Sequence, residues 1–122
     1  MQRIVILGSG TGGTMLANRL AHWRRADWQI TVIEKAAEHI YQPGLLFVPF
    51  GRASIAALKR SSQALIPPSI QRRAGDVERI DPTERIITLK NGESIPYDAL
   101  IVATGVEIAP GEIPGMQGVL WQ

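Results

Sequence analysis

A glycine-rich turn near the N-terminus constrains the fold of this chain more than any other feature. The turn, Gly8-Ser9-Gly10-Thr11-Gly12-Gly13, follows the apolar run at 3–7 and precedes apolar residues spaced as on one side of a helix. In a G-x-G-x-x-G pattern, Gly8 permits the tight turn, Gly10 admits close approach of a pyrophosphate, and Gly13 lets the helix pack on the strand. The sequence therefore predicts a dinucleotide site on a strand, a turn and a helix.

An acidic residue lies at the distance from this turn that such a site requires. Glu34 lies 21 residues beyond Gly13, directly after a second β-branched run at 29–33. A carboxylate there binds the ribose hydroxyls of an adenine nucleotide and repels a 2′-phosphate, which disfavours NADP. The free N–H groups of Thr11, Gly12 and Gly13, at the positive end of the helix dipole, would hold the phosphates.

The order of the predicted elements indicates an α/β fold. The elements are a strand at 3–7, a helix at about 12–24, a strand at 29–33, a helix at 54–65, an antiparallel meander at about 76–97 and a strand at 99–103. Asn91-Gly92 predicts a type I′ hairpin within the meander. We therefore expect one domain over residues 1–122, a Rossmann-type parallel sheet with helices and a small antiparallel β-meander insertion.

Composition excludes several classes of site. The chain has no cysteine, so it can form no disulfide, thiolate zinc site or iron–sulfur cluster. Two histidines exclude a His-rich metal site, and we interpret His39 as a lone surface residue and Arg72-Arg73 as a solvated pair. A net charge of +2 is too small to indicate nucleic acid as a partner. Without a membrane-length apolar run or a secretory signal, we expect a cytoplasmic protein with no metal.

Several blocks of the sequence resemble the flavoproteins that contain two dinucleotide-binding domains. Ile4–Gly13 resembles their N-terminal FAD fingerprint, and Asp76-Val77 resembles the segment whose valine backbone meets the adenine of FAD. Asn91-Gly92 and the following strand, ending in Ala103-Thr104-Gly105, are similar to their hairpin and "ATG" motif. The resemblance implies that the glycine turn binds FAD rather than NAD, with Val77 at the adenine.

A second segment is most similar to the sulfide:quinone oxidoreductases within that superfamily. It runs from Tyr41 to Gly51 and combines prolines and glycines with large apolar side chains. Type II NADH:quinone dehydrogenases have a related loop, and in both families a proline lies near the flavin ring, which implies Pro43 here. Lys35, beside Glu34, can reach the adenosine half of FAD. The full set of expected cofactor-binding residues is Gly8, Gly10, Thr11, Gly12, Gly13, Glu34, Lys35, Pro43, Val77, Ala103, Thr104 and Gly105.

The resemblance implies an FAD-dependent oxidoreductase that transfers electrons from sulfide, received through cysteines, to a quinone. The alternatives are an NADH-oxidising quinone reductase and a non-catalytic dinucleotide-binding module. Members of these families are several times longer, so we expect this chain to be the N-terminal FAD-binding part of a longer enzyme, with no catalytic residue of its own. We also expect the longer enzyme to lie peripherally on the inner face of a membrane and to form a homodimer.

Overall fold

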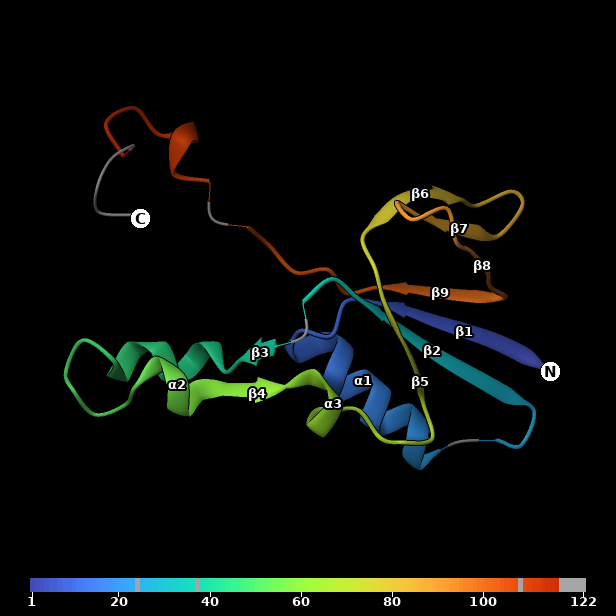
Figure 1. The fold of residues 1–122 in the computed structure, drawn as a ribbon, viewed down its shortest axis with the longest axis horizontal. Coiled ribbons are helices and arrows are strands. Elements are labelled where there is room, and N and C mark those ends of the chain that lie inside the picture. Colours follow the sequence, from blue (N-terminus) through green and yellow to red (C-terminus); the bar gives the residue numbers. More distant parts are fainter. Residues whose placement is uncertain (24, 37, 108, 117–122) are drawn as a thin grey trace.

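The computed structural model describes residues 1–23, 25–36, 38–107 and 109–116, so residue 24, at the end of the first predicted helix, lies outside the described residues. The elements are β1 (Gln2–Leu7), α1 (Thr11–His22), β2 (Trp28–Glu34), β3 (Glu38–Ile40), η1 (Gln42–Phe47), α2 (Ile55–Leu58), β4 (Lys59–Ser61), α3 (Ser62–Leu65), β5 (Gln71–Ala74), β6 (Val77–Asp81), β7 (Ile86–Leu89), β8 (Ser94–Pro96), β9 (Ala99–Val102) and η2 (Pro110–Glu112). Strands β5, β2, β1 and β9 form, in this order, one parallel sheet (Figure 1). The predicted Rossmann-type α/β fold is therefore confirmed.

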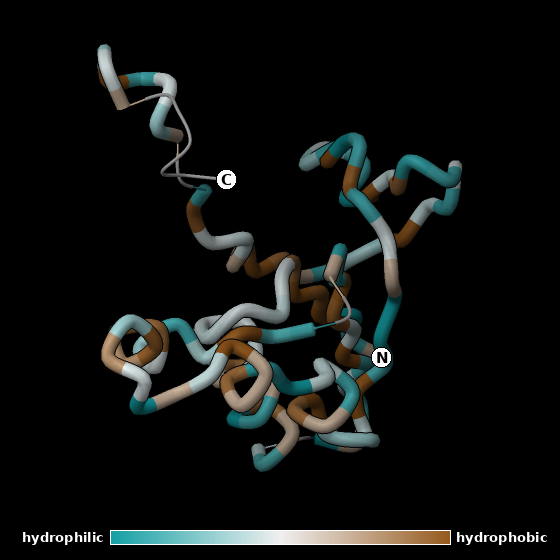
Figure 2. The backbone as a smooth tube through the Cα atoms, turned by 60° about the vertical axis from the view of Figure 1, so that its left-hand side comes forward, coloured by the Kyte–Doolittle hydropathy of each residue, from teal (hydrophilic) through white to brown (hydrophobic). Residues whose placement is uncertain are grey.

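Alternating side chains of the central strands build one apolar core on each face of the sheet. Ile6 belongs to the same buried cluster as Ala17 of α1, whereas Val5 belongs to a second cluster with Ile87 and Leu89 of β7. Successive residues of a strand point to opposite faces, so β1 must be apolar at nearly every position. Figure 2 shows this apolar character along the central strands. The molecule thus has three layers, with α1 on one face of the sheet and the β6-β7-β8 meander on the other.

The predicted antiparallel meander is present, but the turn between β7 and β8 differs from the prediction. A type I′ turn needs positive φ at both central residues. Gly92 has φ +86°, whereas Arg85 is the one non-glycine residue of the described chain with positive φ, so Asn91 does not qualify. The N–H of Gly92 donates to the Leu89 carbonyl at 2.9 Å, and the Asn91 side chain accepts from the Glu93 N–H at 2.9 Å. Gly92 alone supplies the left-handed residue, as in a three-residue hairpin loop.

The single helix predicted over residues 54–65 is wrong. Two short helices, α2 and α3, flank the three-residue strand β4, which pairs antiparallel with β3. Ser54 caps α2 as expected, because its hydroxyl accepts from the Ala57 N–H at 3.2 Å. Ser61 caps α3 in the same way by accepting from the Gln63 N–H at 3.2 Å. Local serine–backbone bonds and the pairing with β3 therefore outweigh the helical spacing of the apolar residues.

A polar clamp joins Arg3, near the start of β1, to Asp98, the residue that precedes the neighbouring strand β9. The Asp98 carboxylate accepts from the Arg3 N–H at 2.7 Å, from its Nε at 3.1 Å and from its Nη2 at 2.8 Å. The Asp98 N–H in turn donates to the Arg3 carbonyl at 2.8 Å. The hydrogen bond from the Arg3 side chain is the largest cause that holds the pKa of the Asp98 carboxyl well below its usual range.

We expect Asp98→Asn to lower the unfolding midpoint at pH 7 and to lower it by less at pH 3, where part of the contribution of the ionised carboxylate is already lost. A carboxyl whose pKa is lowered by folding contributes stability above its unfolded pKa, about 3.9, and loses that contribution as the pH falls further. Thermal unfolding followed by circular dichroism at both pH values measures this difference. Asp27→Asn, at a surface pair with Arg25 of 3.6 Å, is the control and should change little at either pH. An equal loss at pH 3 and pH 7 for Asp98→Asn would contradict the prediction.

Candidate functional site

The glycine turn between β1 and α1 is dictated by close backbone packing at two of its residues. A Cβ on Gly13 would lie 1.9 Å from the Gly8 carbonyl oxygen. Gly8 has φ +96°, and a Cβ there would lie 2.3 Å from the Ala103 carbonyl oxygen. A Cβ on Gly10 or Gly12, by contrast, would meet no atom within 4 Å. Gly8 and Gly13 are thus needed for packing, whereas Gly10 and Gly12 leave open space for a ligand.

The N-terminus of α1 has free hydrogen-bond donors at this turn. Gly10 is its N-cap and provides no side-chain bond, and the first turn contains no acidic residue. The N–H groups of a first helical turn have no acceptor within the helix, and they lie at the positive end of its dipole. Helices α2 and α3 differ, because Ser54 and Ser61 cap them. The N-terminus of α1 is therefore suited to bind an anion such as a phosphate.

A cavity of about 550 Å³ opens at this turn. It lies where β1, β2 and β9 end, which is the edge of a parallel sheet at which nucleotides bind in this type of fold. Eight predicted residues line it: Gly8, Gly10, Thr11, Gly12, Lys35, Ala103, Thr104 and Gly105. Seven further lining residues were not predicted: Ser9, Ala36, Glu38, His39, Ile40, Gln42 and Val106. The local motifs therefore identify about half of the lining of the cavity.

Four predicted residues do not line this cavity. Gly13 is buried in α1, where it packs on the turn, and Glu34 is 4% exposed. Pro43 lies in η1 directly after Gln42, which does line the cavity. Val77 begins β6 and is half-buried against the core beneath the meander. Their expected contacts with a cofactor stay predictions.

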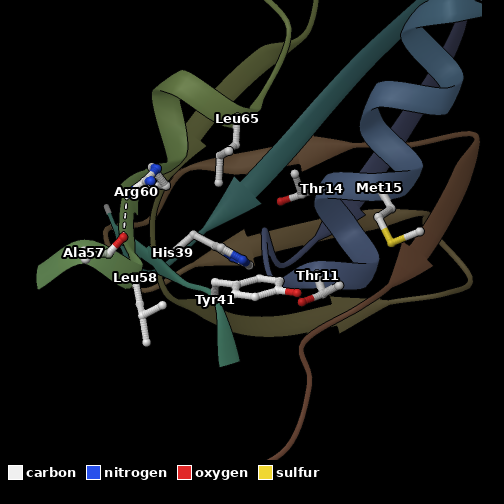
Figure 3. A pocket seen from close by; sticks show the side chains of 9 residues that line it. All are labelled: Thr11, Thr14, Met15, His39, Tyr41, Ala57, Leu58, Arg60 and Leu65. Atoms are coloured by element: carbon white, nitrogen blue, oxygen red, sulfur yellow. Dashed lines mark hydrogen bonds between the residues drawn. The ribbon is translucent and has the colours of Figure 1, made fainter. Parts of the chain in front are cut away.

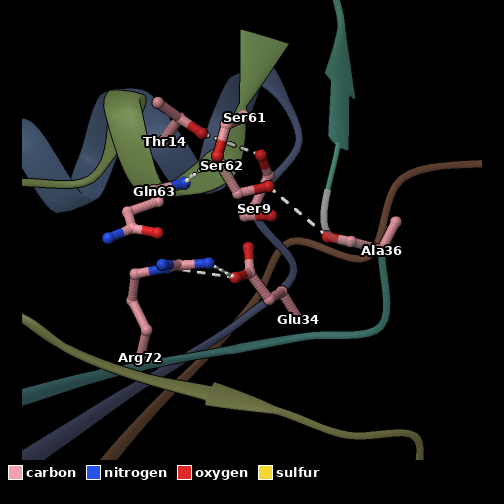
Figure 4. Close-up of polar contacts among 8 residues, drawn as sticks. All are labelled: Ser9, Thr14, Glu34, Ala36, Ser61, Ser62, Gln63 and Arg72. Atoms are coloured by element: carbon pink, nitrogen blue, oxygen red, sulfur yellow. Dashed lines mark hydrogen bonds and ion pairs between the residues drawn. The ribbon is translucent and has the colours of Figure 1, made fainter.

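Glu34 forms a buried ion pair with Arg72 of the neighbouring strand β5 (Figure 4). The Arg72 Nε donates to Glu34 Oε1 at 3.0 Å, and its Nη2 donates to the same oxygen. Glu34 Oε2 is buried and has no hydrogen-bond partner. Burial raises the pKa of the carboxyl, but Arg72 and the nearby hydroxyls of Ser9 and Ser62 together lower it below its ordinary value. The interpretation of Arg72 as a solvated residue is therefore wrong.

Lys35 lies at the rim of the cavity, where its side chain forms an ion pair with Asp76, the residue before β6. Its Nζ is 3.4 Å from Asp76 Oδ2, which also accepts from Lys90 Nζ at 2.7 Å. The hydrogen bond from Lys90 is the largest cause of the lowered pKa of Asp76. The Lys35 side chain is nevertheless 77% exposed, so it can turn toward a ligand in the cavity.

A second cavity, of about 410 Å³, is lined by Thr11, Thr14 and Met15 of α1 and by residues of the β3–α3 segment (Figure 3). Its lining includes Thr11 and His39, which also line the first cavity, together with Tyr41 and Arg60. The guanidinium of Arg60 donates to the carbonyl of Ala57 at 2.8 Å, so it is hydrogen-bonded to the nearby backbone. His39 is half-buried between the two cavities, so it is not the lone surface residue that we expected.

The described residues form neither a metal site nor a membrane-spanning helix. Over these ranges, no group of three His, Cys, Asp or Glu side chains is placed to hold a metal ion. None of the described helices is long and apolar enough to cross a membrane.

Comparison with known proteins identifies clear relatives. Residues 2–121 match the family described as pyridine nucleotide-disulphide oxidoreductase. A mitochondrial sulfide:quinone oxidoreductase of Dictyostelium discoideum is 31% identical over 94% of this chain and 25% of its own length. A type II NADH:quinone oxidoreductase of Mycobacterium tuberculosis is 34% identical over 86% of this chain and 23% of its own length.

The crystal structure of the sulfide:quinone oxidoreductase of Aquifex aeolicus superposes with a TM-score of 0.79 at 26% identity, over 89% of this chain and 25% of that one. The chain thus spans about a quarter of the length of these relatives.

We expect Gly13→Ala to destabilise the fold strongly and Gly10→Ala to change its stability little. The methyl group at residue 13 must displace the Gly8 backbone, so the free energy of unfolding should fall by about 3 kcal/mol or more. At residue 10 the φ of −64° suits alanine and the space is open, so stability should change by less than about 1 kcal/mol. Urea unfolding of the two variants measures both effects. Equal destabilisation by the two substitutions would contradict the packing described here.

Proposed function

The chain belongs to the pyridine nucleotide-disulphide oxidoreductase family, and we propose that it forms the FAD-binding part of a sulfide:quinone oxidoreductase-like flavoenzyme. One observation above all supports the proposal. The uncapped N-terminus of α1 faces a cavity at the carboxyl end of the sheet, beside a glycine that leaves the approach open. A diphosphate is one of the anionic groups that such a helix end binds.

The residues present fit FAD in two ways. The first-turn N–H groups of α1 can bind the diphosphate. Glu34 has a buried oxygen with no hydrogen-bond donor, and a ribose hydroxyl would supply that donor. We propose that Lys35, at the rim, contacts the adenosine half and that the backbone of Val77 contacts the adenine. The proposed contacts of the flavin end are Pro43 and residues 103–105, of which the latter line the cavity. The chemistry that bound FAD would supply is two-electron transfer between a donor and an acceptor.

The proposed donor is sulfide and the proposed acceptor is a quinone. This assignment rests on the similarity to the sulfide:quinone oxidoreductases of Dictyostelium and Aquifex over most of this chain. The Tyr41–Gly51 segment supports an apolar acceptor, because Leu46 and Phe50 in it are 69% and 72% exposed. NADH as donor is the second candidate, since the mycobacterial type II enzyme is 34% identical to this chain. The third is a module that binds the nucleotide without turnover.

We expect the 122-residue chain to bind FAD and Gly10→Val to weaken that binding at least about tenfold. The valine side chain would fill the open space next to the helix terminus and exclude the diphosphate. Quenching of flavin fluorescence on titration measures the dissociation constant, and circular dichroism checks the fold. Ala26→Val, on an exposed turn after α1, is the matched control and should bind FAD like the wild type. Absence of FAD binding by the wild type would refute the proposed function, and unchanged binding by Gly10→Val would refute the site.

We also expect the 122-residue chain, even when saturated with FAD, to show no sulfide-dependent reduction of a ubiquinone analogue. Sulfide chemistry of the proposed kind needs cysteines, and this sequence has none. Quinone absorbance after addition of sulfide measures the rate, and mass spectrometry excludes a longer contaminating enzyme. The gene sequence that follows residue 122 separates the candidates. Cysteines there favour sulfide, and a second G-x-G-x-x-G with an acidic partner favours NADH.

A further inference from the structure

We propose that Arg72 is a positioning residue for the nucleotide: it holds one oxygen of the Glu34 carboxylate and thereby keeps the other for a ribose hydroxyl. This inference rests on the proposed FAD site at the glycine turn. It assigns a role to a strand, β5, that has no residue in the glycine motif or in the lining of the cavity.

The geometry of the ion pair is unusual in using one carboxylate oxygen. Arginine commonly binds a carboxylate through both oxygens, with two parallel bonds. Here Arg72 Nε and Nη2 both donate to Glu34 Oε1, and Oε2 has no partner. The parallel pairing of β5 with β2 fixes this arrangement, because it places Arg72 opposite Val32, two residues before Glu34. The pair therefore leaves one oxygen of a buried carboxylate without a donor.

A buried carboxylate oxygen without a donor is energetically unfavourable, so a ligand that supplies one is bound more tightly. The residues around Oε2 connect it to the cavity. Ser9 and Ala36 flank Glu34 in Figure 4, and both also line the cavity at the glycine turn. The hydroxyl of Ser62, drawn next to Ser9 in Figure 4, donates to the Ala36 carbonyl at 3.4 Å. A hydroxyl that enters from the cavity past Ser9 is the donor that the geometry accommodates.

Arg72 also keeps the Glu34 carboxyl ionised. The groups that face the carboxyl are the guanidinium of Arg72 from β5, the Ser9 hydroxyl from the glycine turn and the Ser62 hydroxyl from α3. Arg72 is the one charged group among them, whereas burial alone would raise the pKa. A charged acceptor binds a hydroxyl more strongly than a neutral carboxyl does. Loss of Arg72 should therefore weaken recognition of the ribose and not of the phosphates.

Binding of ADP and of 2′,3′-dideoxy-ADP to the 122-residue chain tests this role by isothermal titration calorimetry. The wild type should bind ADP at least about tenfold more tightly than the dideoxy compound, as expected for a hydrogen bond to a charged group. In Arg72→Met the ratio of the two dissociation constants should fall below about threefold, mainly through weaker ADP binding. Arg72→Lys retains the charge and should retain most of the discrimination. Arg73→Met is the control, because Arg73 is the next residue of β5, is 52% exposed and pairs with Glu93 at 3.7 Å.

The outcomes separate the failure of this inference from the failure of the proposed function. If the wild type binds neither ADP nor FAD, the proposed function itself fails. If the wild type binds ADP and the dideoxy compound equally, Glu34 does not bind the ribose and the role of Arg72 is overturned. If Arg72→Met weakens both nucleotides by the same factor, Arg72 acts only on the structure, and the inference is again overturned. If circular dichroism shows that Arg72→Met does not fold, the Arg72→Lys variant tests the role of Arg72. Tighter binding of ADP than of the dideoxy compound by Arg72→Lys supports that role, and equal binding of the two nucleotides refutes it.

Discussion

Contact between Gly13 and the carbonyl of Gly8 is the constraint from which the rest of the molecule follows. At this point α1 begins so close to β1 that no side chain fits between them. The contact directs the N-terminus of α1 toward the carboxyl end of the sheet. It also leaves Ile6 to pack on α1 and Val5 to pack on the meander. The same contact therefore determines the layering of the domain and the direction in which its free N–H groups point.

Much of this arrangement could be predicted because its signals are local. The apolar run of β1, the glycines of the turn and the apolar strand β9 lie within short windows whose periodicity indicates one structure. Eight of the predicted site residues line one cavity for the same reason: they follow strands whose carboxyl ends meet at one edge. The meander was also predictable, although the turn type was not. The φ of Asn91 depends on whether the loop has two residues or three, and Asn-Gly is compatible with both.

The rest could not be predicted because it depends on contacts between distant segments. Strand β5 is short and polar, and it is a strand only because it pairs with β2. Arg72 and Glu34 are 38 residues apart in the sequence, so no local pattern connects them. The same applies to His39, which reaches the cavities because β3 pairs with β4. In each case a serine cap or a strand pairing overrides the weak local preference of the segment.

The two outer strands of the sheet differ in how readily they can pair with an additional strand. Strand β5 carries Arg72 and Arg73 in its middle, and charged side chains on an edge strand disfavour the addition of another strand. Strand β9 (Ala99–Val102) has no charge, and no described strand pairs with its outer side. Its unpaired N–H and C=O groups form a template along which an additional strand can be added. Extension of the sheet is therefore favoured on the side of β9, away from Arg72.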